Sequence, residues 1–353
     1  MTSVEKIINK SITGVRITDD DGVRLLEYAD LLTLGLAAHE VCRRKHPTKI
    51  RTYVVDRNIN YTNICVSKCR FCAFYKDIDS PGAYLLSDED IHAKIAEAVS
   101  LGATQILMQG GLHPNLDISY YENLLHRICE RFTVDMHSFS PPEVVHIAKV
   151  SGLTLEQTVM RLKSAGLKSI PGGGAEILTT MSRTRLSPEK CTTDEWLRVM
   201  EIAHGLGMRT TATMMFGHGE TMSERIEHMS RIRELQDRTG GFTAFIPWTF
   251  QPSNTEMGGQ PVGGYDYLRT LAISRLFMDN VENIQASWVT QGAKIGQVAL
   301  HFGANDLGST MIEENVVAAA GVRFRMCEDE LRDAITDAGY IPKKRDTYYR
   351  ILE

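Results

Sequence analysis

Several common signals are missing from this sequence. No apolar run reaches the roughly 18 residues that a membrane-spanning helix needs, and the first residues lack the apolar stretch of a secretory signal. There is no basic excess, since 44 Asp and Glu outnumber 39 Lys and Arg for a formal net charge of −5. This balance disfavours a general nucleic-acid-binding surface. We therefore expect a cytoplasmic protein with neither a nucleic-acid nor a membrane partner.

Other absences narrow the class of protein further. Four of the seven cysteines stand alone, so a disulfide framework is not indicated, and we expect each of the four to be a small buried apolar residue. They are Cys42, Cys129, Cys191 and Cys327. The glycine run at residues 172–174 lacks the Lys-Ser/Thr pair of a phosphate-binding loop and does not match the G-x-G-x-x-G dinucleotide pattern.

No stretch rich in Ser, Gly or Pro marks a linker, so we predict one catalytic domain. The 353 residues are enough for an α/β barrel, which commonly needs about 250 residues plus extensions. Leucines feed an apolar helical face over residues 20–45, and Lys45-His46-Pro47 ends it. We predict an N-terminal helical extension at residues 1–50, the barrel at 51–327, and a C-terminal extension packed on the barrel at 328–353.

Short β-rich runs alternate with amphipathic helical patterns along the chain. The predicted strands are Tyr53–Thr62, Thr104–Gln109, Val134–His137, Ser169–Ile170, Arg209–Phe216, Gly241–Pro247, Asn283–Trp288 and Val298–Phe302. The predicted helices between them include Asp88–Leu101, Ser119–Arg131, Asp194–Leu206, Ser223–Thr239 and Tyr265–Asn280. This alternation favours a parallel sheet, and eight units predict an α/β fold of the (β/α)8 TIM-barrel type, with a doubly wound open sheet as the alternative.

Polar or glycine-rich segments follow six of these predicted strands. They are Cys65–Cys72, Gln109–His113, His137–Ser140, Pro171–Glu176, Phe216–Glu220 and His301–Asp306. Active sites of such barrels lie at the carboxyl ends of the strands. The six segments therefore predict one active site.

The segment Cys65-Val-Ser-Lys-Cys69-Arg-Phe-Cys72 supplies three thiolates from one loop. A structural zinc site takes four protein ligands, and a purely structural iron–sulfur cubane usually takes four cysteines. Three ligands would leave one iron of a [4Fe–4S] cluster open, and S-adenosylmethionine (SAM) carries an amine and a carboxylate that could fill it. The alternative is a zinc knuckle whose fourth ligand is His113, His137 or Cys129.

This loop, with Phe71 before the third cysteine, resembles the signature of the radical SAM superfamily. Further blocks extend the resemblance over most of residues 53–310 and are similar to the menaquinone and deazaflavin branch: Asp56–Cys65, His137–Glu143, Pro171–Ile177, Thr211–His218, Phe245–Pro252 and His301–Gly308. The resemblance implies that Cys65, Cys69 and Cys72 bind a [4Fe–4S] cluster. An electron from a donor such as flavodoxin or ferredoxin would then cleave SAM to methionine and a 5′-deoxyadenosyl radical.

The resemblance also implies the residues that bind SAM. The glycines Gly110 and Gly111 would receive its amino group, and Glu176 would bind its ribose hydroxyls. A cation, Arg183 or Arg185, would meet its carboxylate. Phe71 and Ser140 complete the predicted cofactor-binding set.

Within this branch the resemblance implies a cyclase of the futalosine route to menaquinone. It would take the C4′ hydrogen from the ribose of dehypoxanthine futalosine and form a carbon–carbon bond onto the benzoate ring. The catalytic base would be His218, His301 or Asp306, with Glu220 as a similar candidate. The alternatives are an aminofutalosine synthase, the subunit of FO synthase that joins tyrosine to a deazaflavin precursor, and a non-catalytic zinc-binding module.

Overall fold

The computed structural model describes residues 3–352. Its strands are β1 Ile50–Val54, β2 Asp56–Ile59, β3 Gln105–Met108, β4 Asp135–Ser138, β5 Leu167–Ile170, β6 Arg209–Phe216, β7 Phe242–Thr249, β8 Asn283–Ile284, β9 Asp306–Ser309 and β10 Ile341–Lys344. Its helices are α1 Ser3–Thr13, α2 Asp19–Tyr28, α3 Leu31–Lys45, α4 Asp88–Ser100, α5 Ile118–Arg131, α6 Pro141–Ser151, α7 Leu155–Ala165, α8 Thr180–Leu186, α9 Thr193–Gly205, α10 Met222–Thr239, α11 Gly264–Phe277, α12 Trp288–Gln291, α13 Ala293–Ala299, α14 Val316–Ala319 and α15 Glu328–Asp337.

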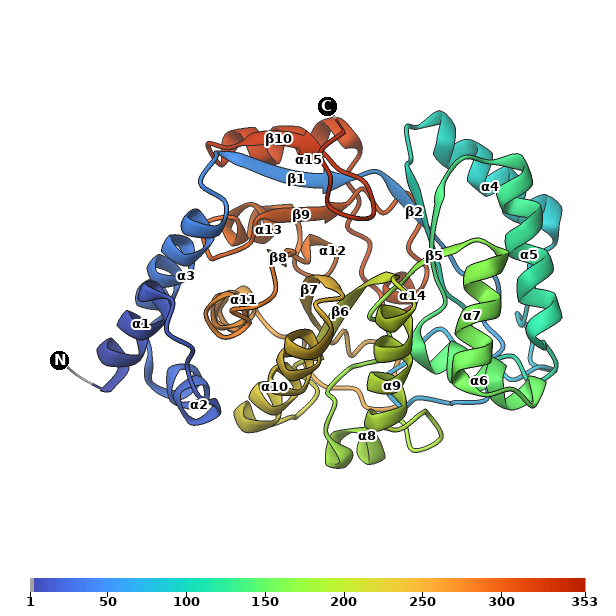
Figure 1. Ribbon diagram of the computed structural model, residues 1–353, viewed down its shortest axis with the longest axis horizontal. Coiled ribbons are helices and arrows are strands. Elements are labelled where there is room, and N and C mark those ends of the chain that lie inside the picture. Colours follow the sequence, from blue (N-terminus) through green and yellow to red (C-terminus); the bar gives the residue numbers. More distant parts are fainter. Residues whose placement is uncertain (1–2, 353) are drawn as a thin grey trace.

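The strands form a parallel barrel with the larger helices around it (Figure 1). Strands β2 to β8 make a seven-stranded sheet in sequence order, and β9 and β10 flank β1 in a second sheet. The ring closes because β1, which pairs with β9, runs directly into β2, which pairs with β3. On the other side, the Ala286 N–H donates to the Asp306 carbonyl at 2.9 Å and links the end of β8 to β9. The α/β barrel prediction is confirmed.

The helices begin where the sequence carries capping signals. Thr221, for example, accepts from the Glu224 N–H at 3.1 Å, while the Glu224 carboxylate accepts from the Thr221 N–H at 2.9 Å. Such a capping box satisfies two backbone donors that would otherwise be unpaired. The predicted helix at Ser223–Thr239 is α10, and the predicted strand at Arg209–Phe216 is β6.

The prediction of the eighth strand at Val298–Phe302 was wrong. This apolar run is the end of α13 and the turn after it, and the strand is β9, at Asp306–Ser309. A short buried run of this kind does not distinguish a strand from a helix by its periodicity. Likewise, only Asn283–Ile284 of the predicted strand Asn283–Trp288 is a strand, because Trp288 begins α12.

The two ends of the chain pack on the barrel. The N-terminal helices lie beside α10 and α11 (Figure 1), and the helix predicted over residues 20–45 is divided where Asp30 caps α3 by accepting from the Thr33 N–H. The C-terminal strand β10 extends the barrel sheet beyond β1. The domain boundaries at residues 50 and 327 stay predictions. Among the described residues, no helix is long and apolar enough to cross a membrane.

Candidate active site

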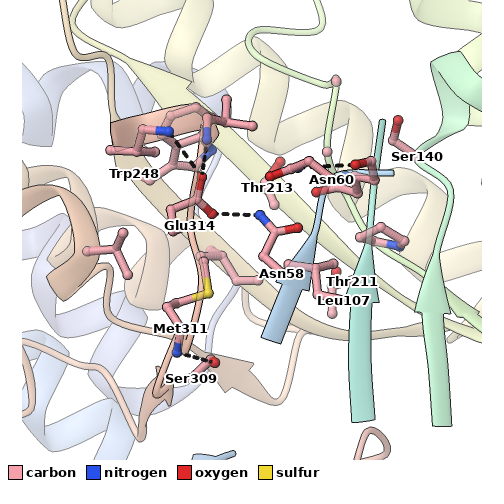
Figure 2. Close-up of a pocket in the computed structure, with 18 of the residues that line it drawn as sticks. Asn58, Asn60, Leu107, Ser140, Thr211, Thr213, Trp248, Ser309, Met311 and Glu314 are labelled. Carbon is pink, nitrogen blue, oxygen red and sulfur yellow. Dashed lines mark hydrogen bonds between the residues drawn. The ribbon is translucent and has the colours of Figure 1, made fainter. Parts of the chain in front are cut away.

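A cavity of about 380 Å³ opens at the carboxyl ends of the barrel strands. Four of the six segments predicted at the active site contribute to its lining: the cysteine loop (residues 65–72), the glycine pair after β3, the segment after β4 and the glycine-rich loop after β5. Figure 2 shows side chains from β2, β3, β6 and β7 and from the chain after β9 converging on it. Four predicted segments therefore meet at one cavity, whereas Phe216–Glu220 and His301–Asp306 are not among the described residues that line it.

All three cysteines of the cysteine loop line this cavity. Its backbone is held against the segment after β3, because the Val66 N–H donates to the Leu112 carbonyl at 3.0 Å. Burial raises the pKa of Cys72 from 9.0 to about 11 and also raises that of Cys65. These two free thiols are therefore neutral near pH 7, and a metal must displace their protons to bind.

The three thiols fit an iron–sulfur cluster better than a single ion. Within residues 3–352, no group of three or more His, Cys, Asp or Glu side chains is arranged to hold one metal ion, as a closed tetrahedral zinc site would require. Of the proposed fourth zinc ligands, Cys129 is exposed on α5, and His113 Nδ1 accepts from the Asn115 N–H at 3.2 Å. Three cysteines on one cavity wall can each bind a different iron of a cluster, which leaves the fourth iron to a ligand.

All four isolated cysteines were predicted to be buried, and two of them are. Cys42 and Cys191 are buried, whereas Cys129 and Cys327 are exposed. The prediction was wrong for the latter pair because composition does not indicate which face of a helix a residue occupies. Cys327 stands at the N-terminal cap of α15.

Close backbone packing explains the glycines beside the cysteine loop. A Cβ on Gly111 would lie 2.1 Å from the Ile64 carbonyl oxygen, and a Cβ on Gly110 would lie 2.5 Å from the Tyr61 ring. These positions let the segment after β3 pass directly beneath the cysteine loop. Both glycines line the cavity, and their role in receiving SAM stays a prediction.

A buried carboxylate, Glu143, joins Gly110 to Ser140. Its Oε1 accepts from the Gly110 N–H at 3.0 Å and from the Tyr61 hydroxyl at 2.9 Å, and its Oε2 accepts from the Ser140 N–H at 2.8 Å. Burial raises the pKa of Glu143 although these hydrogen bonds oppose the rise. Glu143 and Ser140 both line the cavity. Glu143 lies in the block His137–Glu143 that carries the family resemblance, but its position in the sequence predicted no role for it.

Glu176 lines the cavity in a conformation that side chains rarely adopt. Its φ is 40°, and its Oε2 is buried without a hydrogen-bond partner among the described residues. Its Oε1 accepts from Lys190 Nζ at 3.0 Å. Burial lowers the pKa of Lys190, but Cys69 and Glu176 more than offset this and leave it raised.

Lys190 is a cavity cation that the sequence analysis missed. Its Nζ lies 5.2 Å from the centre of the Phe71 ring, so it connects the cysteine loop to Glu176. No local pattern marks it, because it comes from the connection between α8 and α9 and reaches the site only through the fold.

The arginines predicted to meet the SAM carboxylate face elsewhere. Arg183 Nη1 donates to the carbonyls of Gly174 and Ala175 at 3.1 Å, and Nε donates to that of Cys191 at 2.9 Å. Arg185 donates to the Gly219 carbonyl at 3.1 Å. Neither arginine is among the described residues that line the cavity. Arg183 instead holds the glycine-rich loop in place.

None of the three nominated catalytic bases is among the described residues that line the cavity. His218 is buried with Nε2 3.1 Å from the Met215 carbonyl oxygen, and burial lowers its pKa. His301 is exposed on the turn after α13, between the rings of His39 and Tyr340.

The third nominated base, Asp306, is buried behind the cavity wall. Its Oδ1 and Oδ2 accept from Arg345 at 3.1 and 2.5 Å. The fourth candidate, Glu220, is engaged by Arg225 at 2.8 Å. We do not retain these residues as bases. His301 was misplaced because the eighth strand was predicted at the wrong residues.

Two family models match the chain, and together they cover most of it. Residues 59–232 match the radical SAM superfamily, and residues 239–353 match the CofH/MqnC C-terminal region. The chain is 47% identical over 352 residues to the cyclic dehypoxanthine futalosine synthase of Halalkalibacterium halodurans, which covers 99% of this chain and 95% of the relative. The chain belongs to the radical SAM superfamily. It is therefore an enzyme whose cofactors are a [4Fe–4S] cluster and SAM, as its cysteine spacing predicted.

A second relative carries the same name as the first, and a third carries a different one. The chain is 45% identical to the cyclic dehypoxanthine futalosine synthase of Streptomyces coelicolor, covering 99% of this chain and 89% of the relative. It is 40% identical to the 5-amino-6-(D-ribitylamino)uracil–L-tyrosine 4-hydroxyphenyl transferase of Methanopyrus kandleri, covering 98% of this chain and 96% of the relative.

Among solved structures, methylornithine synthase superposes with a TM-score of 0.75 at 18% identity, covering 95% of this chain and 97% of that one. At this identity the likeness supports the shared barrel alone.

Proposed function

We propose that this radical SAM enzyme converts dehypoxanthine futalosine to its cyclic product, by abstraction of the C4′ hydrogen and formation of a carbon–carbon bond onto the benzoate ring. The observation that carries the proposal is the similarity to two relatives named cyclic dehypoxanthine futalosine synthase, 47% and 45% identical over nearly the whole chain. An electron donor such as flavodoxin or ferredoxin is the proposed protein partner.

The proposed cofactor site follows from the cavity lining. Cys65, Cys69 and Cys72 would hold the cluster, and when bound the cluster and SAM supply a primary carbon radical. Glu176, whose Oε2 accepts no hydrogen bond and lies 3.7 Å from Arg183 Nη1, would bind the SAM ribose. Lys190 takes the place of Arg183 as the proposed partner of the SAM carboxylate, because it is the cation that lines the cavity beside Phe71.

The rest of the cavity would position the substrate. A primary radical abstracts whichever hydrogen lies nearest, so regiospecific abstraction needs a tightly held substrate. Apolar side chains from Leu107, Trp248 and Met311 can pack against the benzoate ring (Figure 2). The carboxyl groups of Asp56 and Glu314 line the cavity, and burial raises the pKa of both. We propose one of these two as the base that takes the ring proton, in place of the three residues nominated from the sequence.

The second candidate function is the tyrosine transferase reaction. Its support is that relatives with this name are 40% and 45% identical to the chain, close to the values for the cyclases. The cofactor site would serve both reactions in the same way. Only the substrate side of the cavity distinguishes them.

The test is an anaerobic assay of the protein with a reconstituted cluster, reductant and SAM. We expect dehypoxanthine futalosine to stimulate formation of 5′-deoxyadenosine and to give a product two hydrogens lighter than the substrate. Turnover of tyrosine with 5-amino-6-(D-ribitylamino)uracil, and none of dehypoxanthine futalosine, would replace the cyclase by the transferase. Formation of 5′-deoxyadenosine with neither substrate turned over would leave only the coarser assignment to the superfamily.

A further inference from the structure

Buried polar atoms without a hydrogen-bond partner gather on the cavity wall. Among residues 3–352, five such atoms belong to cavity-lining side chains that are at most 8% exposed: Asn58 Oδ1, Asn60 Oδ1, His137 Nδ1, Glu176 Oε2 and Thr347 Oγ1. A buried polar atom left unpaired costs free energy, so such atoms indicate where a ligand supplies the missing partner. Glu176 is already assigned to SAM above, whereas the two asparagines have no assigned ligand.

Asn58 and Asn60 share one face of β2 and its continuation. They lie two residues apart on β2 and its continuation, so the alternation of a strand turns both side chains into the barrel. Figure 2 shows both of them in the cavity. Asn58 is 4% exposed and Asn60 is 2% exposed.

The protein fixes which atom of each amide faces the cavity. The Asn60 Nδ2 donates to the Gln109 carbonyl oxygen at 3.1 Å. A carbonyl oxygen only accepts, so the nitrogen must point toward it, and Oδ1 is left for the cavity. The amide of Asn60 is thus oriented as an acceptor toward the ligand.

Asn58 is oriented in the same way by Glu314. The Asn58 Nδ2 donates to Glu314 Oε2 at 2.6 Å. The other carboxylate oxygen accepts from the N–H groups of Val316 and Val317, at 2.8 and 3.0 Å, which anchors Glu314 at the start of α14. The segment after β9 therefore holds the Asn58 amide with its Oδ1 unpaired.

We propose that the carbonyl oxygens of Asn58 and Asn60 bind hydroxyl groups on the sugar part of the substrate. This inference rests on the proposed function. Two acceptors need donors, and the sugar hydroxyls are the donors that dehypoxanthine futalosine carries, because its ketone and its ionised carboxylate only accept. The benzoate carboxylate would meet no donor at this pair.

The placement also orients the substrate. Asn60 precedes Cys65 by five positions on a segment that leads directly from β2 into the cysteine loop. Hydroxyls bound at Asn58 and Asn60 therefore bring the sugar, and not the ring, to the side of the cavity where the cluster-binding cysteines lie. Hydrogen abstraction from a sugar carbon requires this orientation.

The test measures binding without turnover. Calorimetry on the protein loaded with cluster and SAM, but without reductant, gives the Kd of dehypoxanthine futalosine and of analogues that each lack one sugar hydroxyl. We expect Asn58→Ala and Asn60→Ala each to raise the Kd about three- to tenfold, the range for one lost hydrogen bond. For at least one analogue, the Kd of the variant should equal that of the unaltered protein, because the hydroxyl that the asparagine contacts is already absent.

A matched control separates this contact from a general effect of removing an amide. Asn280 donates to the Arg233 carbonyl and to Asp237 at 2.8 and 2.6 Å, outside the cavity. Asn280→Ala should leave the Kd unchanged, and the SAM affinity of Asn58→Ala should match that of the unaltered protein. If an alanine variant does not load the cluster, Asn58→Ser and Asn60→Ser provide smaller changes for the same measurement.

Two results would overturn the inference. One is an unchanged Kd in both variants. The other is a variant that raises the Kd of every deoxy analogue by the same factor as the Kd of dehypoxanthine futalosine. Such a result indicates an effect through structure and not through a hydroxyl contact. If only 5-amino-6-(D-ribitylamino)uracil binds, the proposed substrate is wrong, and the same variants measured with that ribityl compound decide the role of the asparagines. Binding of neither compound would also overturn it.

Discussion

At the cysteine loop, burial works against the thiolate that a metal needs. The pKa of Cys72 is raised to about 11, first by burial and further by the neighbouring Cys69. Without metal, thiols of this kind are protonated and apolar enough to remain in the cavity wall. Cluster assembly must therefore release protons, and the cluster in turn stabilises the loop.

We expect Cys65→Ala, Cys69→Ala and Cys72→Ala each to abolish SAM cleavage, because each removes one of three ligands. Iron content and 5′-deoxyadenosine formation measure this. The control is Cys327→Ser, an exposed position at the N-terminal cap of α15, where serine is a favourable residue. SAM cleavage retained in any of the first three variants would show that the ligand assignment is wrong.

His228 should make the stability of the protein depend on pH. Burial lowers its pKa from 6.5 to about 3. Between these values only the unfolded chain binds the proton, so stability falls as pH falls through this window. From pH 7 to pH 5 the loss from this residue is about 2 kcal/mol.

The measurement is urea unfolding at pH 7 and pH 5. The variant His228→Gln keeps an acceptor for the Leu178 N–H, which donates to His228 Nδ1 at 3.0 Å. Its loss of unfolding free energy between the two pH values should be smaller than that of the unaltered protein by about 2 kcal/mol. Equal losses in the two proteins would show that folding does not lower the pKa of His228.

At the scale of elements, the cysteine loop depends on how closely the segment after β3 approaches it. We expect Gly111→Ala to reduce cluster loading, because the new Cβ would lie 2.1 Å from the Ile64 carbonyl oxygen, a backbone atom that cannot move without moving the loop. Iron content after reconstitution measures the loss, and circular dichroism should show the barrel unchanged.

A glycine with open space around it provides the control. Gly205 lies at the end of α9, and a Cβ added there would meet no described atom within 4 Å beyond its own helix and chain neighbours. Gly205→Ala should therefore leave iron content unchanged. Normal loading in Gly111→Ala would show that the loop tolerates the displacement.

The sequence predicted most elements because their signals are local. The strand at Arg209–Phe216 and the helix at Ser223–Thr239 lie within a residue of β6 and α10. The failure at Val298–Phe302 has a physical reason: α13 is short and buried on one side, and its apolar residues satisfy a strand pattern as well as a helical one. Hydrogen bonding between β9 and β1, which lie far apart in the chain, selected the actual strand.

At the scale of the whole molecule, an ion pair joins the C-terminal segment to the barrel. Arg345, which follows β10, donates to both carboxylate oxygens of Asp306 at the start of β9. We expect Arg345→Met to destabilise the protein by about 3–5 kcal/mol, because it leaves a buried carboxylate without its cation. The unfolding free energy from urea denaturation measures the loss.

A double variant tests the reason for that loss. Arg345→Met combined with Asp306→Asn removes the buried charge, and it should recover part of the lost stability. A loss below about 1 kcal/mol in Arg345→Met alone would contradict this account, since that is the size of an exposed ion pair.

The sequence by itself determined the cofactor chemistry and the barrel. Three cysteines within eight positions lie in one loop whatever the rest of the chain does, and alternating strands and helices have few ways to bury their apolar faces. Only the tertiary structure decided which polar side chains line the cavity. It placed Lys190 and Glu314 there and left His218 and His301 outside. The physical reason is that spacing is a local property of the chain, whereas a side chain enters the cavity through strand register and packing between residues far apart in sequence.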